Sequence, residues 1–268
     1  MAIGGDGRVH VIALVNQKGG SGKTTTCLNV AGALAERELS VLVVDLDPQA
    51  SFTVALDMEP PRAGRLSDAL LSDDTDLASL IRQTTIPGID LIPGDPELRR
   101  VELAMSELEG REMRLRAALQ ASMRALRGRY SYILIDCPPA LGYLTANANN
   151  AANEVILPMN LDKMGMNALG TTMRTINLVR GSTNLALQVL GILPTQVNMR
   201  TKLDQARDEY LRSLYNGQVF TTVIPSSVQV KEAIEMSVPV TVYAKRGAIA
   251  KRYRKLVDEI VDREARYA

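Results

Sequence analysis

Short apolar runs rich in Val, Ile and Leu alternate along the chain with longer stretches whose apolar residues have helical spacing. A short apolar run between polar segments is typical of a strand that is buried on both faces. The predicted strands are residues 9–15, 41–46, 132–135, 155–159, 189–193 and 219–224, and the predicted helices are 24–38, 96–127, 141–153, 167–179, 203–214 and 247–266. Strands that alternate with helices predict an α/β fold, with a doubly wound, mostly parallel sheet and helices on both faces.

Two stretches depart from this pattern. Residues 57–94 are punctuated by prolines and glycines, among them Pro60, Gly64 and Pro87, and we expect a surface excursion there, not a second domain. Residues 97–129 mix Glu and Arg with apolar residues at helical intervals, which predicts a solvated amphipathic helix. The sequence has no repeat and no low-complexity tail, so residues 1–268 are expected to form one domain.

The composition is that of an ordinary globular protein, with 46% hydrophobic and 23% charged residues among 268. Two cysteines cannot form a disulfide scaffold, so we expect a reducing, cytoplasmic environment. No apolar run approaches the roughly 18 residues of a membrane span, and the first ten residues do not resemble a signal peptide, so neither membrane integration nor secretion is expected. The formal net charge of +1 gives no overall field for nucleic acid, and any such binding needs a local basic patch or a dimer.

The most specific motif is the glycine-rich loop of residues 16–25, between the first predicted strand and the first predicted helix. Successive glycines let backbone N–H groups turn toward phosphate oxygens, Lys23 can reach the β- and γ-phosphates, and the Thr24 hydroxyl can ligate Mg²⁺. The implied ligand is a nucleoside triphosphate with magnesium; the alternative is a glycine-rich turn without a ligand. The residues expected to contact the phosphates are Lys18, Gly19, Gly20, Ser21, Gly22, Lys23, Thr24 and Thr25.

This loop departs from the strict pattern G-x-x-x-x-G-K-[ST], because Gln17 occupies the position of the first glycine. It carries an additional lysine, Lys18, five positions before Lys23. A side chain so placed cannot easily fold back onto the phosphates of its own loop. We therefore expect Lys18 to reach a nucleotide on a partner subunit.

Acidic residues end two of the other predicted strands. Asp45 and Asp47 follow the second run, and alternation places both on one face, which suits a metal ion or an attacking water. Asp136 ends the run 132–135, as the Asp of a magnesium-binding strand does in nucleotide hydrolases. Ligands of such sheets bind outside the carboxyl ends of the strands, where the glycine-rich loop also lies. The alternative is that strand ends simply tolerate carboxylates.

The loop, the Asp-Leu-Asp-Pro-Gln segment 45–49 and the segment 135–139 together resemble the ParA-type partition ATPases, within the deviant P-loop group that also holds the MinD-type ATPases and the nitrogenase iron protein. The resemblance covers nearly the whole chain. It implies a cytoplasmic, nucleoid-associated ATPase with ATP and Mg²⁺ as cofactors. It also implies an ATP-dependent homodimer that binds DNA without sequence preference, and a ParB-type centromere-binding partner that stimulates hydrolysis.

The resemblance assigns a role to each matching residue. Lys23 binds phosphate, Lys18 is the signature lysine that reaches across the dimer, and Asp47 orients the attacking water, so these three form the catalytic set. Thr24 ligates magnesium directly and Asp136 through water; with Asp47 they form the expected metal site. Asn198 and Pro225 are the expected contacts to the rest of the nucleotide.

One departure from the family concerns DNA. The segment Ile-Pro-Arg-x-x-Arg, which supplies arginines to DNA in the family, reads Ile-Pro-Ser-Ser-Val-Gln at residues 224–229. The compensating candidates lie elsewhere, although such a basic run is more often a solvated helix face. They are Arg200, Lys202, Lys231, Lys245, Arg246, Lys251, Arg252 and Arg254.

Three alternatives share the loop. A MinD-type positioning ATPase needs a C-terminal amphipathic anchor, whereas residues 256–268 hold four acids and no Phe or Trp. An iron-protein-like carrier needs two cluster cysteines per subunit, whereas Cys27 falls within a predicted helix, where core packing is expected. A nucleotide-switched scaffold would use the same residues as the partition ATPase, and only stimulation by a partner distinguishes them.

Overall fold

The computed structural model describes residues 8–72 and 76–266 of the chain. Its frame is an eight-stranded sheet in the order β3-β4-β2-β5-β1-β6-β7-β8. All neighbouring strands are parallel except β3 and β4, which confirms the predicted mostly parallel α/β sheet. The strands are β1 His10–Leu14, β2 Val41–Asp45, β3 Arg82–Gln83, β4 Ile89–Ile92, β5 Tyr132–Asp136, β6 Glu154–Met159, β7 Gln188–Val197 and β8 Ile224–Pro225.

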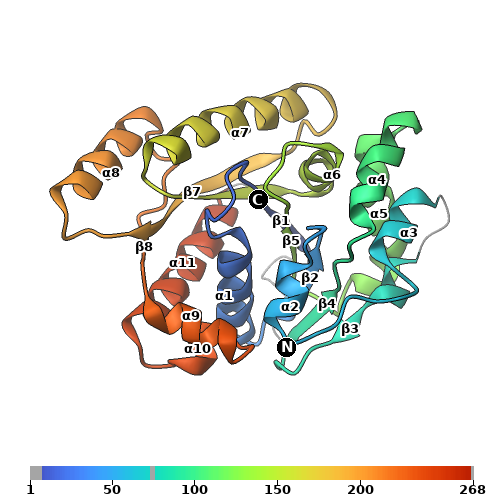
Figure 1. Ribbon diagram of the computed structural model, residues 1–268, viewed down its shortest axis with the longest axis horizontal. Helices are drawn as coiled ribbons and strands as arrows, with labels where there is room; N and C mark the ends of the chain where they lie inside the picture. Colours follow the sequence, from blue (N-terminus) through green and yellow to red (C-terminus); the bar gives the residue numbers. More distant parts are fainter. Residues whose placement is uncertain (1–7, 73–75, 267–268) are drawn as a thin grey trace.

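Helices cover both faces of this sheet (Figure 1). One layer packs side by side around α1 and α11 and consists of α1 Lys23–Ala35, α2 Ser51–Ala55, α9 Val228–Glu235, α10 Val240–Tyr243 and α11 Ala248–Glu264. The other layer consists of α3 Leu66–Leu71, α4 Leu98–Ala104, α5 Arg114–Leu126, α6 Tyr143–Ala151, α7 Lys163–Ser182 and α8 Lys202–Leu214. Among the described residues, no helix is both long and apolar enough to cross a bilayer.

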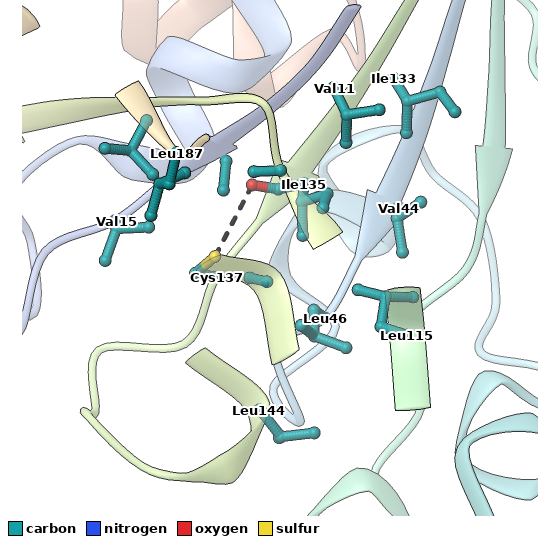
Figure 2. Close-up of a cluster of buried hydrophobic side chains, with 14 of the residues drawn as sticks. Val11, Val15, Val44, Leu46, Leu115, Ile133, Ile135, Cys137, Leu144 and Leu187 are labelled. Atoms are coloured by element: carbon teal, nitrogen blue, oxygen red, sulfur yellow. Dashed lines mark hydrogen bonds between the residues drawn. The ribbon is translucent and has the colours of Figure 1, made fainter. Parts of the chain in front are cut away.

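Strict alternation along the central strands divides the core between the two layers. Val11 and Ala13 of β1 belong to the cluster beneath α4 to α7, whereas Ile12 and Leu14 belong to the cluster beneath α1 and α11. Figure 2 shows part of the first cluster, where Cys137 packs with its thiol toward the Ile135 carbonyl oxygen. Because both faces of the strands are covered, nearly every strand residue is apolar.

The stretch 57–94 is more ordered than the sequence predicts. The expectation of a surface excursion is wrong for Ile89–Ile92, which form β4, a buried strand that pairs in parallel with β2. This strand escapes prediction because it has only four residues and lies between two Pro-Gly pairs. Its short neighbour β3 is exposed, whereas the helix α3 of the same stretch buries Leu66, Ala69 and Leu70 in the core.

Two further predicted elements are shorter than expected. The predicted helix 96–127 divides into α4 and α5, because Gly110 adopts a left-handed φ of 60° between them. The predicted strand 219–224 is mostly loop: Val219 makes a single bridge to Ile192, and β8 begins only at Ile224. The carboxylate of Glu259 on α11 accepts the backbone N–H groups of Thr221 and Thr222, so these amides do not bond to a neighbouring strand.

Candidate active site

The glycine-rich loop lies at the carboxyl end of β1 and is fixed by its surroundings on two sides. Thr195 Oγ1 donates to the Ser21 carbonyl oxygen at 2.8 Å, and Gln196 Nε2 donates to that of Gly20 at 3.0 Å. On the other side, Asn16 Nδ2 donates to the Pro158 carbonyl oxygen of β6 at 2.7 Å. Thr195 and Gln196 lie on β7, far from the motif in the chain. They contact the loop because the strand order of the sheet places β7 near β1.

The loop presents unused donors. Gly20 and Gly22 have φ angles of 72° and 84°, a left-handed backbone that glycine adopts without strain. The backbone N–H groups of residues 19–23 donate to no other described residue, and no side chain caps α1. Free amides at the N-terminus of a 13-residue helix form an anion site, because the helix dipole adds to the N–H charges.

Lys23 opens α1 and is 6% exposed. Its Nζ lies 3.4 Å from the Lys18 carbonyl oxygen, the loop's own backbone. Burial lowers the pKa of this ammonium, and the carboxylates of Asp136 and Asp47 oppose the effect. A buried lysine between a loop of free amides and two acids is placed to neutralise a phosphate chain.

Asp136 ends β5 on the α1 side of the sheet and is fully buried. Among the described residues, neither of its carboxylate oxygens makes a hydrogen bond with ordinary geometry. Burial and the neighbouring Asp45 raise the pKa of Asp136 well above its usual value, although Thr24 and Lys23 limit the rise. A buried carboxylate without hydrogen bonds suits a hard cation, so this site fits magnesium.

Asp45 pairs in register with Asp136 across β2 and β5, but its oxygens are occupied. Asp45 Oδ2 accepts the N–H and the hydroxyl of Thr53 at 2.9 and 2.7 Å, and Oδ1 accepts the Asp47 N–H at 3.3 Å. The hypothesis that Asp45 serves a metal or a water is therefore not supported by the structure. Asp45 instead fixes α2 and the turn that carries Asp47.

Asp47 lies just beyond β2 and is 7% exposed. Its Oδ1 accepts the Gln49 N–H at 2.9 Å, which closes a small turn. Its charge acts on Lys23 and on Asp136, so the three groups share one electrostatic environment. The structure thus brings together Lys23, Asp47 and Asp136, with Thr24 beside them, as the motifs predict.

Lys18 does not approach the loop's centre. Its Nζ donates to Asp162 Oδ2 at 2.5 Å, and Asp162 Oδ1 accepts the Gly165 N–H at 2.6 Å as the N-cap of α7. Partial burial raises the pKa of Asp162, but the hydrogen bonds from Lys18 and Gly165 outweigh this and hold the pKa below its usual value. Sequence reasoning missed this partner of Lys18, which is 144 residues away in the chain.

A pocket of about 390 Å³ adjoins the end of the loop. Gly22, Thr25 and Thr26 form one wall, Pro225 and Val228 another, and Tyr253 of α11 closes the base. Pro225, a predicted nucleotide contact, lines this pocket beside the end of the loop. Asn198 does not line this pocket: it is exposed, and its Oδ1 accepts the Arg200 N–H in the turn before α8.

The basic candidates are distributed over the surface. Arg254 is committed to a fold contact, because its guanidinium donates to both carboxylate oxygens of Glu36 at 2.6 and 2.9 Å. This contact makes Arg254 a poor candidate for DNA. The other candidates are exposed: Arg200, Lys202, Lys231, Lys245, Arg246, Lys251 and Arg252.

Comparison with known proteins places this geometry in a family. Residues 9–189 match the family described as AAA domain. Chromosome partitioning protein ParA of Caulobacter vibrioides is 38% identical over 257 residues, which cover 96% of this chain and 95% of that protein. The chain belongs to the ParA family of partition ATPases.

Two more ParA-like or fold-related proteins extend this comparison. Sporulation initiation inhibitor protein Soj of Bacillus subtilis is 36% identical over 93% of this chain and 97% of its own length. The solved structure of cobyrinic acid a,c-diamide synthase from Mycobacterium smegmatis, with bound ATP analog and magnesium, has a TM-score of 0.81 and 32% identity, and the match covers 94% of this chain and 93% of that one. The ParA-family fold, with its phosphate loop, defines the chain as an ATP hydrolase.

Proposed function

We propose that this chain is a partition ATPase that binds ATP with magnesium, dimerises in the ATP state and binds DNA without sequence preference. The observation that carries the proposal is the set of free amides in residues 19–23 together with the fully buried carboxylate of Asp136, whose charge acts on Lys23. The bound ATP analog and magnesium of the M. smegmatis structure support the same cofactors here. Chromosome or plasmid DNA is the proposed cargo class, in a single-domain, nucleoid-associated protein.

Each charged residue has a proposed part in hydrolysis. The loop amides and Lys23 hold the phosphate chain, and the adenosine end occupies the pocket beside Pro225 and Tyr253. Thr24 would hold magnesium directly and Asp136 would hold it through water, and the ion would supply positive charge that stabilises the phosphates. Asp47 orients the attacking water. Catalysis of this kind is positioning and electrostatics, with little covalent work for the protein.

Lys18 has a proposed part in dimerisation. Within one copy its ammonium is bound to Asp162, away from the loop's own phosphate site. To reach a nucleotide on the partner subunit, Lys18 must leave Asp162 for the more concentrated charge of a triphosphate. A ParB-type protein that binds this dimer and accelerates hydrolysis is the proposed partner.

The proposed DNA surface is the exposed side of α11 and the turn before it. Lys245, Arg246, Lys251 and Arg252 are exposed there, and no ion pair of any of them is seen among the described residues. Lys231 on α9 extends the surface beyond Ser226 and Ser227, where the family has its Ile-Pro-Arg segment. Clustered Lys and Arg bind phosphate without reading sequence.

The testing experiment measures binding of a duplex DNA of arbitrary sequence with ATP, with ADP and without nucleotide, over a series of salt concentrations. We expect binding only with ATP, and an affinity that falls steeply as salt rises. A Lys251→Ala and Arg252→Ala double variant should bind more weakly and reduce the salt slope by about two. Arg124→Ala, on the opposite face, is the matched control. Equal binding in all nucleotide states, or none in any, contradicts the proposal.

A further inference from the structure

A second group of buried titratable side chains lies at the amino ends of the strands, opposite the ATPase site. It comprises His10 at the start of β1, Glu154 at the start of β6 and Glu264 at the end of α11. His10 is the chain's one histidine. Glu154 and Glu264 are 7% and 6% exposed, so two carboxylates are buried beside one imidazole.

The donor atoms of these three side chains face one another. His10 Nδ1 lies 3.6 Å from Glu264 Oε1 and 4.0 Å from Glu154 Oε1. One potential ligand atom of each residue lies within 4.8 Å of a potential ligand atom of each of the other two. Tetrahedral zinc with ligand distances of about 2.0–2.1 Å needs its ligand atoms roughly 3.4 Å apart. The 3.6 Å separation of His10 Nδ1 from Glu264 Oε1 is close to that value.

The groups around the cluster orient its ligands. The Tyr132 hydroxyl donates to Glu264 Oε2 at 2.7 Å, which leaves Oε1 facing the imidazole. The Tyr132 ring also stacks on the His10 ring, with centroids 5.4 Å apart. Hydrogen bonds and packing of this kind, one layer beyond the ligands, fix ligand geometry in protein metal sites.

A cavity gives access to the cluster and supplies an independent sign of a polar ligand. It has a volume of about 870 Å³, and His10, Glu154 and Glu264 line it. Asn150 lines the same cavity, is 2% exposed, and its Oδ1 has no hydrogen-bond partner among the described residues. A buried amide oxygen without a donor suits a bound water or cation.

We propose that His10, Glu154 and Glu264 form a binding site for a divalent transition-metal ion, with zinc as the best fit. One imidazole nitrogen with two carboxylate oxygens is a donor set that suits Zn²⁺, whereas Mg²⁺ prefers oxygen ligands alone. Asn150 lines the same cavity, on the α6 side. The ion would tie the end of α11 to the starts of β1 and β6, and it is separate from the magnesium of the ATPase site.

The test titrates Zn²⁺ into untagged, nucleotide-free protein and follows the imidazole proton resonances. Because His10 is the one histidine of the chain, these signals report on the proposed site directly. We expect one equivalent of Zn²⁺ to shift them, and the melting temperature to rise in the same titration. Calorimetry should show at least tenfold weaker binding for Glu264→Gln, which retains the oxygen that Tyr132 contacts, and for His10→Gln.

The matched control is Glu235→Gln, an exposed glutamate at the end of α9, which should bind Zn²⁺ as the wild type does. Glu264→Gln lies in the last turn of α11, so it tests the site even if His10→Gln does not fold. Two outcomes overturn the proposal. One is unchanged imidazole signals with millimolar Zn²⁺ present; the other is zinc affinity that neither substitution weakens.

Discussion

The two ends of the paired strands β1 and β5 both hold buried acids, but they are built differently. At the carboxyl end, Leu14 pairs with Asp136, and the glycine-rich loop and α1 follow directly in the chain. At the amino end, His10 pairs with Tyr132, and the acids come from β6 and α11. Alternation along β1, β5 and β6 places His10, Asp136 and Glu154 on the face that α1 and α11 cover.

The difference concerns how each end compensates its buried charge. At the carboxyl end, Lys23 and the unused loop amides lie beside buried acids. The lysine and the amides suit an anion, and the acids suit a cation bound with it. The amino end places an imidazole beside two glutamates, a set of electron-pair donors that suits a divalent cation. The same sheet therefore offers a nucleotide site at one edge and a candidate metal site at the other.

Lys23→Ala should give the largest effect, which should be confined to the carboxyl ends of the strands. Removing the buried ammonium should weaken ATP binding by about 30-fold or more, because loss of a buried charge partner costs about 2–5 kcal/mol. The ATP-induced dimer should disappear from light scattering, while the zinc response of His10 remains. Lys163→Ala, an exposed lysine at the start of α7, is the control. An ATP-induced dimer of normal size would contradict the assigned role.

Asp47→Ala should slow ATP hydrolysis while leaving ATP binding nearly unchanged. Without the group that orients water, turnover should fall by about 10²-fold or more, the usual range for a lost acid–base group. ATP affinity should change little, so the dimer should accumulate. Steady-state phosphate release and light scattering measure the two effects, with the exposed Asp262→Ala as control. Normal turnover would remove Asp47 from the mechanism.

Asp45→Asn should change the pH dependence of stability. Burial raises the pKa of Asp45 to about 6, against about 3.9 in the unfolded chain. Between these values the folded state binds more protons than the unfolded state, so stability falls as pH rises, by up to roughly 3 kcal/mol. Urea unfolding at pH 4 and pH 6.5 should show this loss in the wild type, relative to the variant.

The substitution Asp262→Asn serves as the control for that experiment, because it removes an exposed acid on α11 without changing the strands. An equal pH slope in wild type and Asp45→Asn would show that the hydrogen bonds from Thr53 keep Asp45 ionised throughout. The amino end should be unaffected in either case, since no contact joins Asp45 to His10.

Asp162→Asn should give the smallest effect. Asparagine retains the N-cap that accepts the Gly165 N–H but removes the charge that holds Lys18. A partly exposed ion pair is worth up to about 1 kcal/mol, so ATP-dependent dimerisation should tighten by up to about fivefold. Analytical ultracentrifugation measures the dimer constant. Unchanged or weaker dimerisation would mean that Asp162 does not compete for Lys18.

Much of the fold was predictable because its strands are buried on both faces and read as apolar runs. β1, β2, β5 and β6 lie within a residue or two of their predicted bounds. The miss at β4 has a physical cause, since four residues between turns carry too little pattern to identify a strand. The loop was predictable because a phosphate site requires adjacent residues, and the two acids were predictable because each directly follows an apolar run that predicts a strand.

The sequence by itself determined the phosphate loop, the strand-end acids and the parallel sheet, since each depends on residues that are neighbours in the chain. Only the tertiary structure decided the partner of Lys18, the commitment of Asp45 to Thr53, and the meeting of His10 with Glu154 and Glu264. These contacts join segments that are distant in sequence. The order of strands in the sheet creates them, and no local pattern of residues encodes that order.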